Sequence, residues 1–209
     1  MKRARILLAD DHSLTLEGIR TVLEPHHEIV GTAADGRALL EAALRLKPEL
    51  IVLDITMPLL NSIDAAVQIK KSLPETKLLF VTMHVNPAYL EAALDAGGTG
   101  YVLKSAAGRE LLEAVDSVLK GRIYITPSLS GEYLERFRDP TQAAAALRLS
   151  TREREVLQLI AEGHAAKEIA HVLNISIRTV AFHRENIKRK LGLRSTSELT
   201  KHAIEQRLI

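Results

Sequence analysis

The chain has 209 residues, enough for one large domain or two small ones, and 46% of them are hydrophobic. It contains no cysteine, which excludes disulfide scaffolds and thiolate metal sites. The formal net charge is +2, but its distribution is uneven. Residues 1–125 carry 14 Lys/Arg against 16 Asp/Glu, whereas residues 126–209 carry 14 against 10. This asymmetry favours a nucleic-acid-binding domain in the second part of the chain.

The amino-terminal residues do not resemble a targeting or membrane-spanning segment. Their apolar run from Ile6 to Ala9 is ended by Asp10 and Asp11, so it is too short for a signal peptide or a transmembrane helix. We therefore expect a cytoplasmic protein that has no membrane partner.

Strand-like and helix-like segments alternate over residues 1–124. The strand-like runs are apolar throughout, which is typical of strands covered on both faces. Five strand–helix units predict an α/β domain with a doubly wound, five-stranded parallel sheet of order 2-1-3-4-5. The expected strands are Arg5–Ala9, Ile29–Ala33, Leu50–Leu53, Leu78–Val81 and Tyr101–Leu103, and the expected helices are Leu14–Leu23, Ala38–Leu46, Ile63–Lys71, Ala88–Ala96 and Glu110–Leu119.

The pattern weakens over residues 125–147, which we interpret as a linker that allows short helical stretches at Ser128–Phe137 and Gln142–Ala146. From residue 148 to residue 209 it predicts an all-α domain. Ser150 with Glu153 and Ser195 with Glu198 fit capping boxes at helix starts. The two middle helices, joined by a short polar turn, predict a helix-turn-helix. The four expected helices are Thr151–Ala161, Lys167–Leu173, Arg178–Leu191 and Ser197–Gln206.

Polar side chains stand at the ends of the predicted strands. Asp10 and Asp11 follow the first strand, Asp54 the third, Thr82 the fourth and Lys104 the fifth. In a sheet of this order the first and third strands are neighbours, and ligands bind outside their carboxyl ends. Clustered aspartates suit Mg²⁺ (or Mn²⁺), and such an ion with Lys104 would neutralise a transferring phosphoryl group. Asp54 is then the expected nucleophile.

These residues, together with Met57-Pro58 and the run Gly100–Lys104, resemble the receiver domain of two-component response regulators. The resemblance implies that Asp10 and Asp11 are an acidic metal pair and that Asp54 is the phosphoacceptor and a further metal ligand. It also implies that the backbone carbonyl of Thr56 is a further protein ligand to Mg²⁺.

The same resemblance gives roles to residues around the acidic cluster. It implies that Thr82 and Lys104 contact the phosphoryl group and that Tyr101 is a switch aromatic, which turns inward when the hydroxyl moves toward phosphate. Thr56 and His84 match positions that tune dephosphorylation. Ser62 departs from the pattern, because it stands where receivers usually have glycine, and we expect a less permissive loop there.

The third helix of the carboxy-terminal domain has one apolar and one basic face. Val180, Ile187 and Leu191 align on the buried side when residues are placed at about 100° intervals. A helix surrounded only by water has no reason to expose an aromatic ring on its other side, whereas a helix in the DNA major groove can use it against a thymine methyl group. The face opposite the apolar stripe carries Arg178, Ala181, Phe182, Glu185, Lys188 and Arg189.

The carboxy-terminal part is similar to the LuxR-type helix-turn-helix through Leu149–Leu157, Lys167–Ala170, Thr179-Val180 and His183-Arg184. A receiver followed by this output domain is the order found in NarL/FixJ response regulators. Ala165 and Ala166 replace a usual Ser-Asn cap, and Ala181 replaces a common DNA-contacting lysine. The expected DNA-contacting residues are Arg178, Thr179, Ala181, Phe182, Glu185, Lys188, Arg189, Lys190 and Arg194.

We therefore expect a transcription regulator, and not an enzyme, that a sensor histidine kinase phosphorylates on Asp54. Phosphorylation is expected to control homodimerisation and sequence-specific binding to double-stranded DNA. One alternative is a receiver-based protein-interaction module whose helical domain no longer binds DNA. Another is a metal-dependent phosphohydrolase, for which the sequence shows no further catalytic motif.

Overall fold

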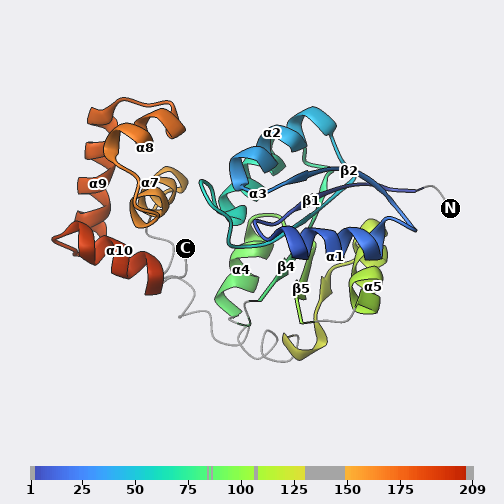
Figure 1. Ribbon diagram of the computed structural model, residues 1–209. Coiled ribbons are helices and arrows are strands. Elements are labelled where there is room, and N and C mark those ends of the chain that lie inside the picture. Colours follow the sequence, from blue (N-terminus) through green and yellow to red (C-terminus); the bar gives the residue numbers. More distant parts are fainter. Residues whose placement is uncertain (1–2, 84, 86, 106–107, 130–148, 206–209) are drawn as a thin grey trace.

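The structure is a computed structural model that describes residues 3–83, 85, 87–105, 108–129 and 149–205. The described chain forms an α/β domain followed by a helical domain (Figure 1). None of the helices in these ranges is long and apolar enough to cross a membrane. Residues 127–129 are helical, while the rest of the stretches expected at Ser128–Phe137 and Gln142–Ala146 lies outside the described residues.

A parallel sheet forms the centre of the α/β domain, and its strands follow the order β2-β1-β3-β4-β5-β6. The first five strands have the predicted order, which confirms the doubly wound fold. The strands are β1 (Arg5–Ala9), β2 (Glu28–Ala33), β3 (Leu50–Leu53), β4 (Lys77–Thr82), β5 (Gly100–Leu103) and β6 (Tyr124–Ile125).

Helices cover both faces of the sheet. Successive strand residues point to opposite sides, so Leu7 and Leu53 lie in the core cluster under α2, α3 and α4, while Ile6 and Val52 lie in the cluster under α1 and α5. This double coverage explains why the strands are apolar along their whole length. The helices are α1 (Ser13–Leu23), α2 (Gly36–Leu46), α3 (Ser62–Ser72), α4 (Pro87–Asp95) and α5 (Gly108–Leu119).

The sixth strand, β6, was not predicted and lies where we placed the start of the linker. Tyr124 and Ile125 pair with Gly100 and Tyr101 at the edge of the sheet. Beyond the strand, Leu129 is 4% exposed and belongs to the core cluster of the α/β domain. The α/β domain therefore continues past residue 124, where the sequence pattern placed its end.

The carboxy-terminal domain consists of helices packed around their own core, as predicted. Ser150 and Glu153 form the expected capping box, since the Glu153 carboxylate accepts the Ser150 N–H at 2.7 Å and the Ser150 hydroxyl accepts the Glu153 N–H at 3.3 Å. Val180 and Ile187 of α9 face this core. The helices are α7 (Thr151–Ala161), α8 (Ala166–Leu173), α9 (Ile177–Leu191) and α10 (Thr196–Glu205).

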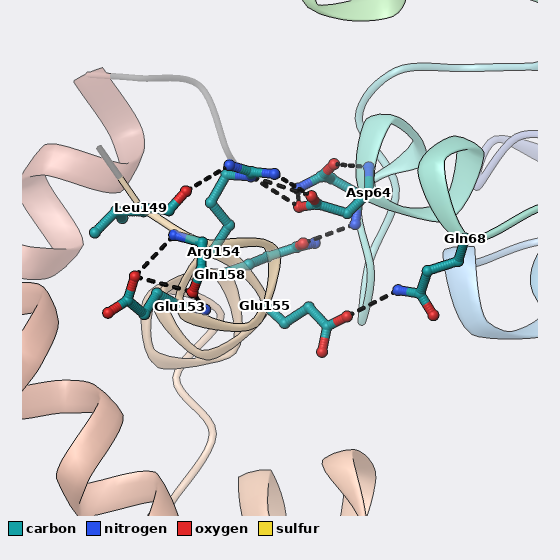
Figure 2. Close-up of polar contacts among 9 residues, drawn as sticks. Asp64, Gln68, Leu149, Glu153, Arg154, Glu155 and Gln158 are labelled. Atoms are coloured by element: carbon teal, nitrogen blue, oxygen red, sulfur yellow. Dashed lines mark hydrogen bonds and ion pairs between the residues drawn. The ribbon is translucent and has the colours of Figure 1, made fainter. Parts of the chain in front are cut away.

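Polar side chains of α7 join the two domains. Figure 2 shows Arg154 reaching Asp64 of α3, where its Nη2 lies 2.6 Å from the Asp64 Oδ1. The Gln68 amide donates to Glu155 at 2.9 Å, and the Arg37 guanidinium of α2 lies 3.6 Å from the same carboxylate. Asp64 is fully buried, and this burial raises its pKa although Arg154 opposes the shift. The helical domain thus docks through α7 against α2 and α3 (Figure 1).

Candidate functional site

Asp10 and Asp54 lie side by side at the carboxyl edge of the sheet. Strands β1 and β3 pair in parallel with Ala9 opposite Leu53, and the Asp54 N–H donates to the Ala9 carbonyl at 2.9 Å. Asp10 is 1% exposed and Asp54 is 7% exposed. The pairing of the two strands therefore holds two nearly buried carboxylates together at the sheet edge.

Lys104 joins these two carboxylates from the end of β5. Its Nζ lies 2.6 Å from the Asp54 Oδ2 and 2.7 Å from the Asp10 Oδ2, and its N–H donates to the Thr82 carbonyl at 2.7 Å. Burial alone lowers the pKa of Lys104, but the hydrogen bonds and charges of both aspartates outweigh it, so the pKa is raised. Burial also raises the pKa of Asp54, and Lys104 opposes that shift. The site is a buried ion cluster with one cation.

A divalent cation fits the same edge of the sheet. Ligand atoms of Asp10, Asp11, His12 and Asp54 all lie within 4.8 Å of one another. Carboxylate oxygens are the ligands that hard cations prefer, so the donor set suits an ion of this kind. His12 was not predicted, yet its Nδ1 lies 2.8 Å from the Asp11 Oδ1 and its N–H donates to the Asp10 Oδ1 at 2.9 Å. Its position directly after Asp10 and Asp11 in the sequence could have indicated that His12 belongs to this cluster.

The other residues expected near the phosphoryl group have different surroundings. Thr82 ends β4 and is fully buried. Thr56 lies two residues beyond Asp54 in the loop between β3 and α3 and is half-buried. Metal binding by the Thr56 carbonyl stays a prediction. His84 lies outside the described residues.

Tyr101 is fully buried and shares a core cluster with Phe80 of β4 and with Leu90 and Ala93 of α4. Burial raises the pKa of its phenol, with smaller contributions from Tyr89 and Asp54. The sequence-based expectation was that the ring turns inward on phosphorylation. In this structure the ring packs in the core, and its movement on phosphorylation stays a prediction.

The loop between β3 and α3 leads into Ser62, which stands where receiver domains usually have glycine. Ser62 is the first residue of α3 and has no positive φ, so its position does not require glycine. Instead Leu59 has a φ of 66°, a left-handed conformation that residues with a side chain rarely adopt. The unusual backbone of this loop thus lies three residues before the position that the sequence pattern singled out.

The candidate DNA-reading face of α9 is open to solvent. Phe182 is 63% exposed, and Arg178, Glu185 and Arg189 are exposed as well. Ser176 caps the helix by accepting the Thr179 N–H at 3.0 Å. The face predicted from helical periodicity is therefore the exposed one.

Several of the expected DNA-contacting side chains have partners inside the helical domain. The Lys190 Nζ donates to the Glu153 carboxylate of α7 at 2.6 Å, and the Thr179 hydroxyl lies 2.8 Å from that of Ser176. On the exposed face, Lys188 lies 3.2 Å from the Glu185 carboxylate. Lys190 therefore has a structural contact that the sequence did not reveal. Arg189 is exposed, and its guanidinium donates to the Asn186 side chain of the same helix at 2.8 Å.

Family patterns match both domains of the chain. The response regulator receiver domain matches residues 6–116, and the luxR family of bacterial regulatory proteins matches residues 147–203. The first match covers the acidic cluster, and the second covers α7 to α9 completely.

Similar proteins share this two-domain organisation. The chain is 34% identical to the transcriptional regulatory protein MctR of Rhizobium johnstonii, over 99% of this chain and 96% of MctR. It is 37% identical to the oxygen regulatory protein NreC of Staphylococcus aureus, over 98% and 99% of the two chains. Among solved structures, RcsB bound to DNA has a TM-score of 0.60 at 32% identity, over 96% of this chain and 97% of that chain. The chain belongs to the NarL/FixJ response regulators, which join a receiver domain to a LuxR-type DNA-binding domain.

Proposed function

We propose that this response regulator is phosphorylated on Asp54 by a sensor histidine kinase, and that phosphorylation controls dimerisation and binding to double-stranded DNA. In this role the chain is a regulator and not an enzyme. The observation that carries the proposal is the ion cluster at the sheet edge, where one Lys104 ammonium contacts both Asp54 and Asp10. A nucleophilic carboxylate and a cation for the incoming phosphate are thereby adjacent.

Mg²⁺ would be held by Asp10, Asp11 and Asp54, with the Thr56 carbonyl as a further ligand, and would offset negative charge on the phosphoryl group. The chain's own residues supply the rest of the chemistry. An Asp54 carboxylate oxygen attacks phosphorus and forms the new O–P bond, while the P–N bond of the kinase phosphohistidine breaks. The electron pair of that bond returns to the imidazole nitrogen. Lys104 then exchanges a carboxylate oxygen of Asp54 for a phosphoryl oxygen.

The helical domain supplies the output. The face of α9 combines the exposed ring of Phe182 with exposed cations, as a major-groove reading helix requires. A related regulator, RcsB, has been solved in complex with DNA, and MctR is named as a transcriptional regulator. We therefore propose that this chain also binds DNA through α9, as a two-fold dimer on paired half-sites.

The test is labelling of the full chain by radioactive acetyl phosphate in the presence of Mg²⁺. Asp54→Asn removes the nucleophile, so label incorporation is expected to disappear. Asp116→Asn is the matched control, because Asp116 is an aspartate of the same domain whose side chain is 53% exposed and pairs with Lys120. This control is expected to label like the wild type. Label retained in Asp54→Asn, or no label in the wild type, contradicts the proposed function.

A further inference from the structure

One side chain of the DNA-binding domain closes on the loop that follows Asp54. The Gln158 Nε2 donates to the Met57 carbonyl at 2.7 Å, and the Gln158 Oε1 accepts the Asn61 N–H at 2.8 Å. Gln158 is 1% exposed, and Figure 2 shows it among the contacts between the domains. A single buried amide therefore holds both ends of the segment 57–61.

A second side chain holds the middle of this segment. The Glu162 carboxylate accepts the Leu59 N–H at 3.2 Å, and it also accepts a hydrogen bond from the Gln158 Nε2 at 2.7 Å. The Leu59 side chain packs against the core of the helical domain. Leu59 has the unfavourable φ of 66°, and these contacts stabilise that backbone conformation.

The held segment is connected directly to the phosphorylation site. The Ile55 N–H donates to the Asp54 Oδ1 at 2.7 Å, and the Ile55 carbonyl accepts the Ser62 N–H at 3.1 Å. Thr56, the expected carbonyl ligand of Mg²⁺, lies between Ile55 and the Met57 that Gln158 binds. Movement of segment 57–61 must therefore be transmitted to the backbone beside Asp54.

The docking of the helical domain on the receiver domain does not cover the DNA-reading face of α9. Phe182 of α9 is 63% exposed in the docked arrangement, whereas the described contacts between the domains come from α7 and Glu162. The docked domain thus acts on the phosphorylation site more directly than on access to α9.

We propose that Gln158 is a positioning residue for the phosphorylation site: it holds segment 57–61 in the docked conformation and thereby slows phosphoryl transfer to Asp54. Asp54 is only 7% exposed and bound to Lys104, so the site must open to admit a phosphoryl group and a hydrated cation. The Gln158 contacts resist that opening. By linkage, phosphorylation weakens the docking of the helical domain to the same extent. This inference rests on the proposed function.

The first measurement is the initial rate of labelling by acetyl phosphate, with full-length chains and at several Mg²⁺ concentrations. Gln158→Ala is expected to raise the rate about fivefold or more, because it removes two hydrogen bonds to segment 57–61 and each corresponds to a factor of roughly two or more. Gln68→Ala is the matched control, because it removes an interdomain hydrogen bond to Glu155 that does not involve segment 57–61. The control is expected to stay within about twofold of the wild type.

The second measurement separates this role from a merely structural one. Hydrogen exchange of the Leu59 and Asn61 amides is expected to accelerate in Gln158→Ala, and also in the wild type when beryllofluoride is added with Mg²⁺. Should Gln158→Ala fail to fold, Gln158→Glu takes its place, since it keeps an acceptor for Asn61 but loses the donor to Met57. The proposal is overturned if hydrogen exchange of these amides accelerates in Gln158→Ala while its labelling rate stays unchanged or falls. It is also overturned if Gln68→Ala raises the labelling rate as much as Gln158→Ala does. A wild type that does not label at all refutes the proposed function, and the role of Gln158 with it.

Discussion

At the scale of single residues, the proposed phosphorylation site combines reactivity with a cost in stability. Three aspartates gather at the sheet edge, Lys104 contacts two of them, and burial raises the pKa of Asp54. A carboxylate with a raised pKa is disfavoured in its ionised form by the folded protein, so it destabilises the fold above that pKa. Reactive sites commonly carry such a cost.

Asp54→Asn is therefore expected to raise the melting temperature at neutral pH by about 2–4 °C. The gain is expected to shrink as the pH falls through the raised pKa of Asp54, because the wild-type carboxyl then takes up its proton and loses the unfavourable charge. Thermal melts of both proteins between pH 5 and pH 8, run in the presence of EDTA, provide the comparison. An Asn variant that melts below the wild type throughout this range contradicts the account.

Most of this site could be predicted because strand ends converge in a parallel sheet. Asp10, Asp54 and Lys104 follow apolar strands, and the sheet order alone brings them to one edge. The contact of His12 with Asp11 could not be derived, since it depends on the turn after β1 and not on strand order. The buried rotamer of Tyr101 was also beyond the pattern, because an aromatic ring at that point suits both a buried and an exposed rotamer.

At the scale of elements, two neighbouring cations of α9 differ in their contacts with the rest of the helical domain. Lys190 reaches across to Glu153 of α7, whereas Arg189 projects from the exposed side. Although burial acts to raise it, hydrogen bonds from Lys190 and Ser150 lower the pKa of Glu153. A lowered pKa means that the ionised Glu153 stabilises the folded helical domain.

Lys190→Ala is expected to destabilise the helical domain by about 1 kcal/mol, a modest value because Lys190 is itself partly exposed. The difference from the wild type is expected to be full above the ordinary pKa of Glu153 and to vanish as the pH falls through its lowered value. Denaturant unfolding at neutral and acidic pH measures this.

Arg189→Ala serves as the comparison. It is expected to change stability little and to weaken DNA binding. The slope of the logarithm of the DNA-binding constant against the logarithm of salt concentration is expected to fall by about one. If Lys190→Ala leaves stability unchanged and lowers the salt slope instead, the lysine contacts phosphate in solution.

Helical periodicity predicted which side of α9 is buried, since Val180 and Ile187 are nearly inaccessible and Phe182 is exposed. Strand β6 was missed for a physical reason. Two residues are too few to show a strand pattern, and Tyr124–Ile125 is a strand only because the edge of β5 offers it hydrogen-bond partners. Short edge strands of this kind depend on tertiary contacts and not on local sequence.

At the scale of the whole molecule, the contact between the domains could not be predicted. Glu155 and Gln158 are polar residues on a helix, which a sequence pattern assigns to the solvent face, yet both are buried against the receiver domain. Their partners include the backbone groups of Met57 and Asn61, which any sequence would provide. Docking therefore depends on the match between two folded surfaces, and it leaves the DNA-reading face of α9 open.

In the proposed function, the chemical state of Asp54 controls DNA binding by the intact chain. Fluorescence anisotropy with a duplex selected from a random-sequence pool measures this directly, for the wild type and Asp54→Asn, with and without acetyl phosphate and Mg²⁺. We predict that phosphorylation tightens binding by the wild type about tenfold or more, a typical size for coupling between two sites. The affinity of Asp54→Asn should not change. Equal affinities for both states of the wild type, or the same gain in Asp54→Asn, would contradict the account.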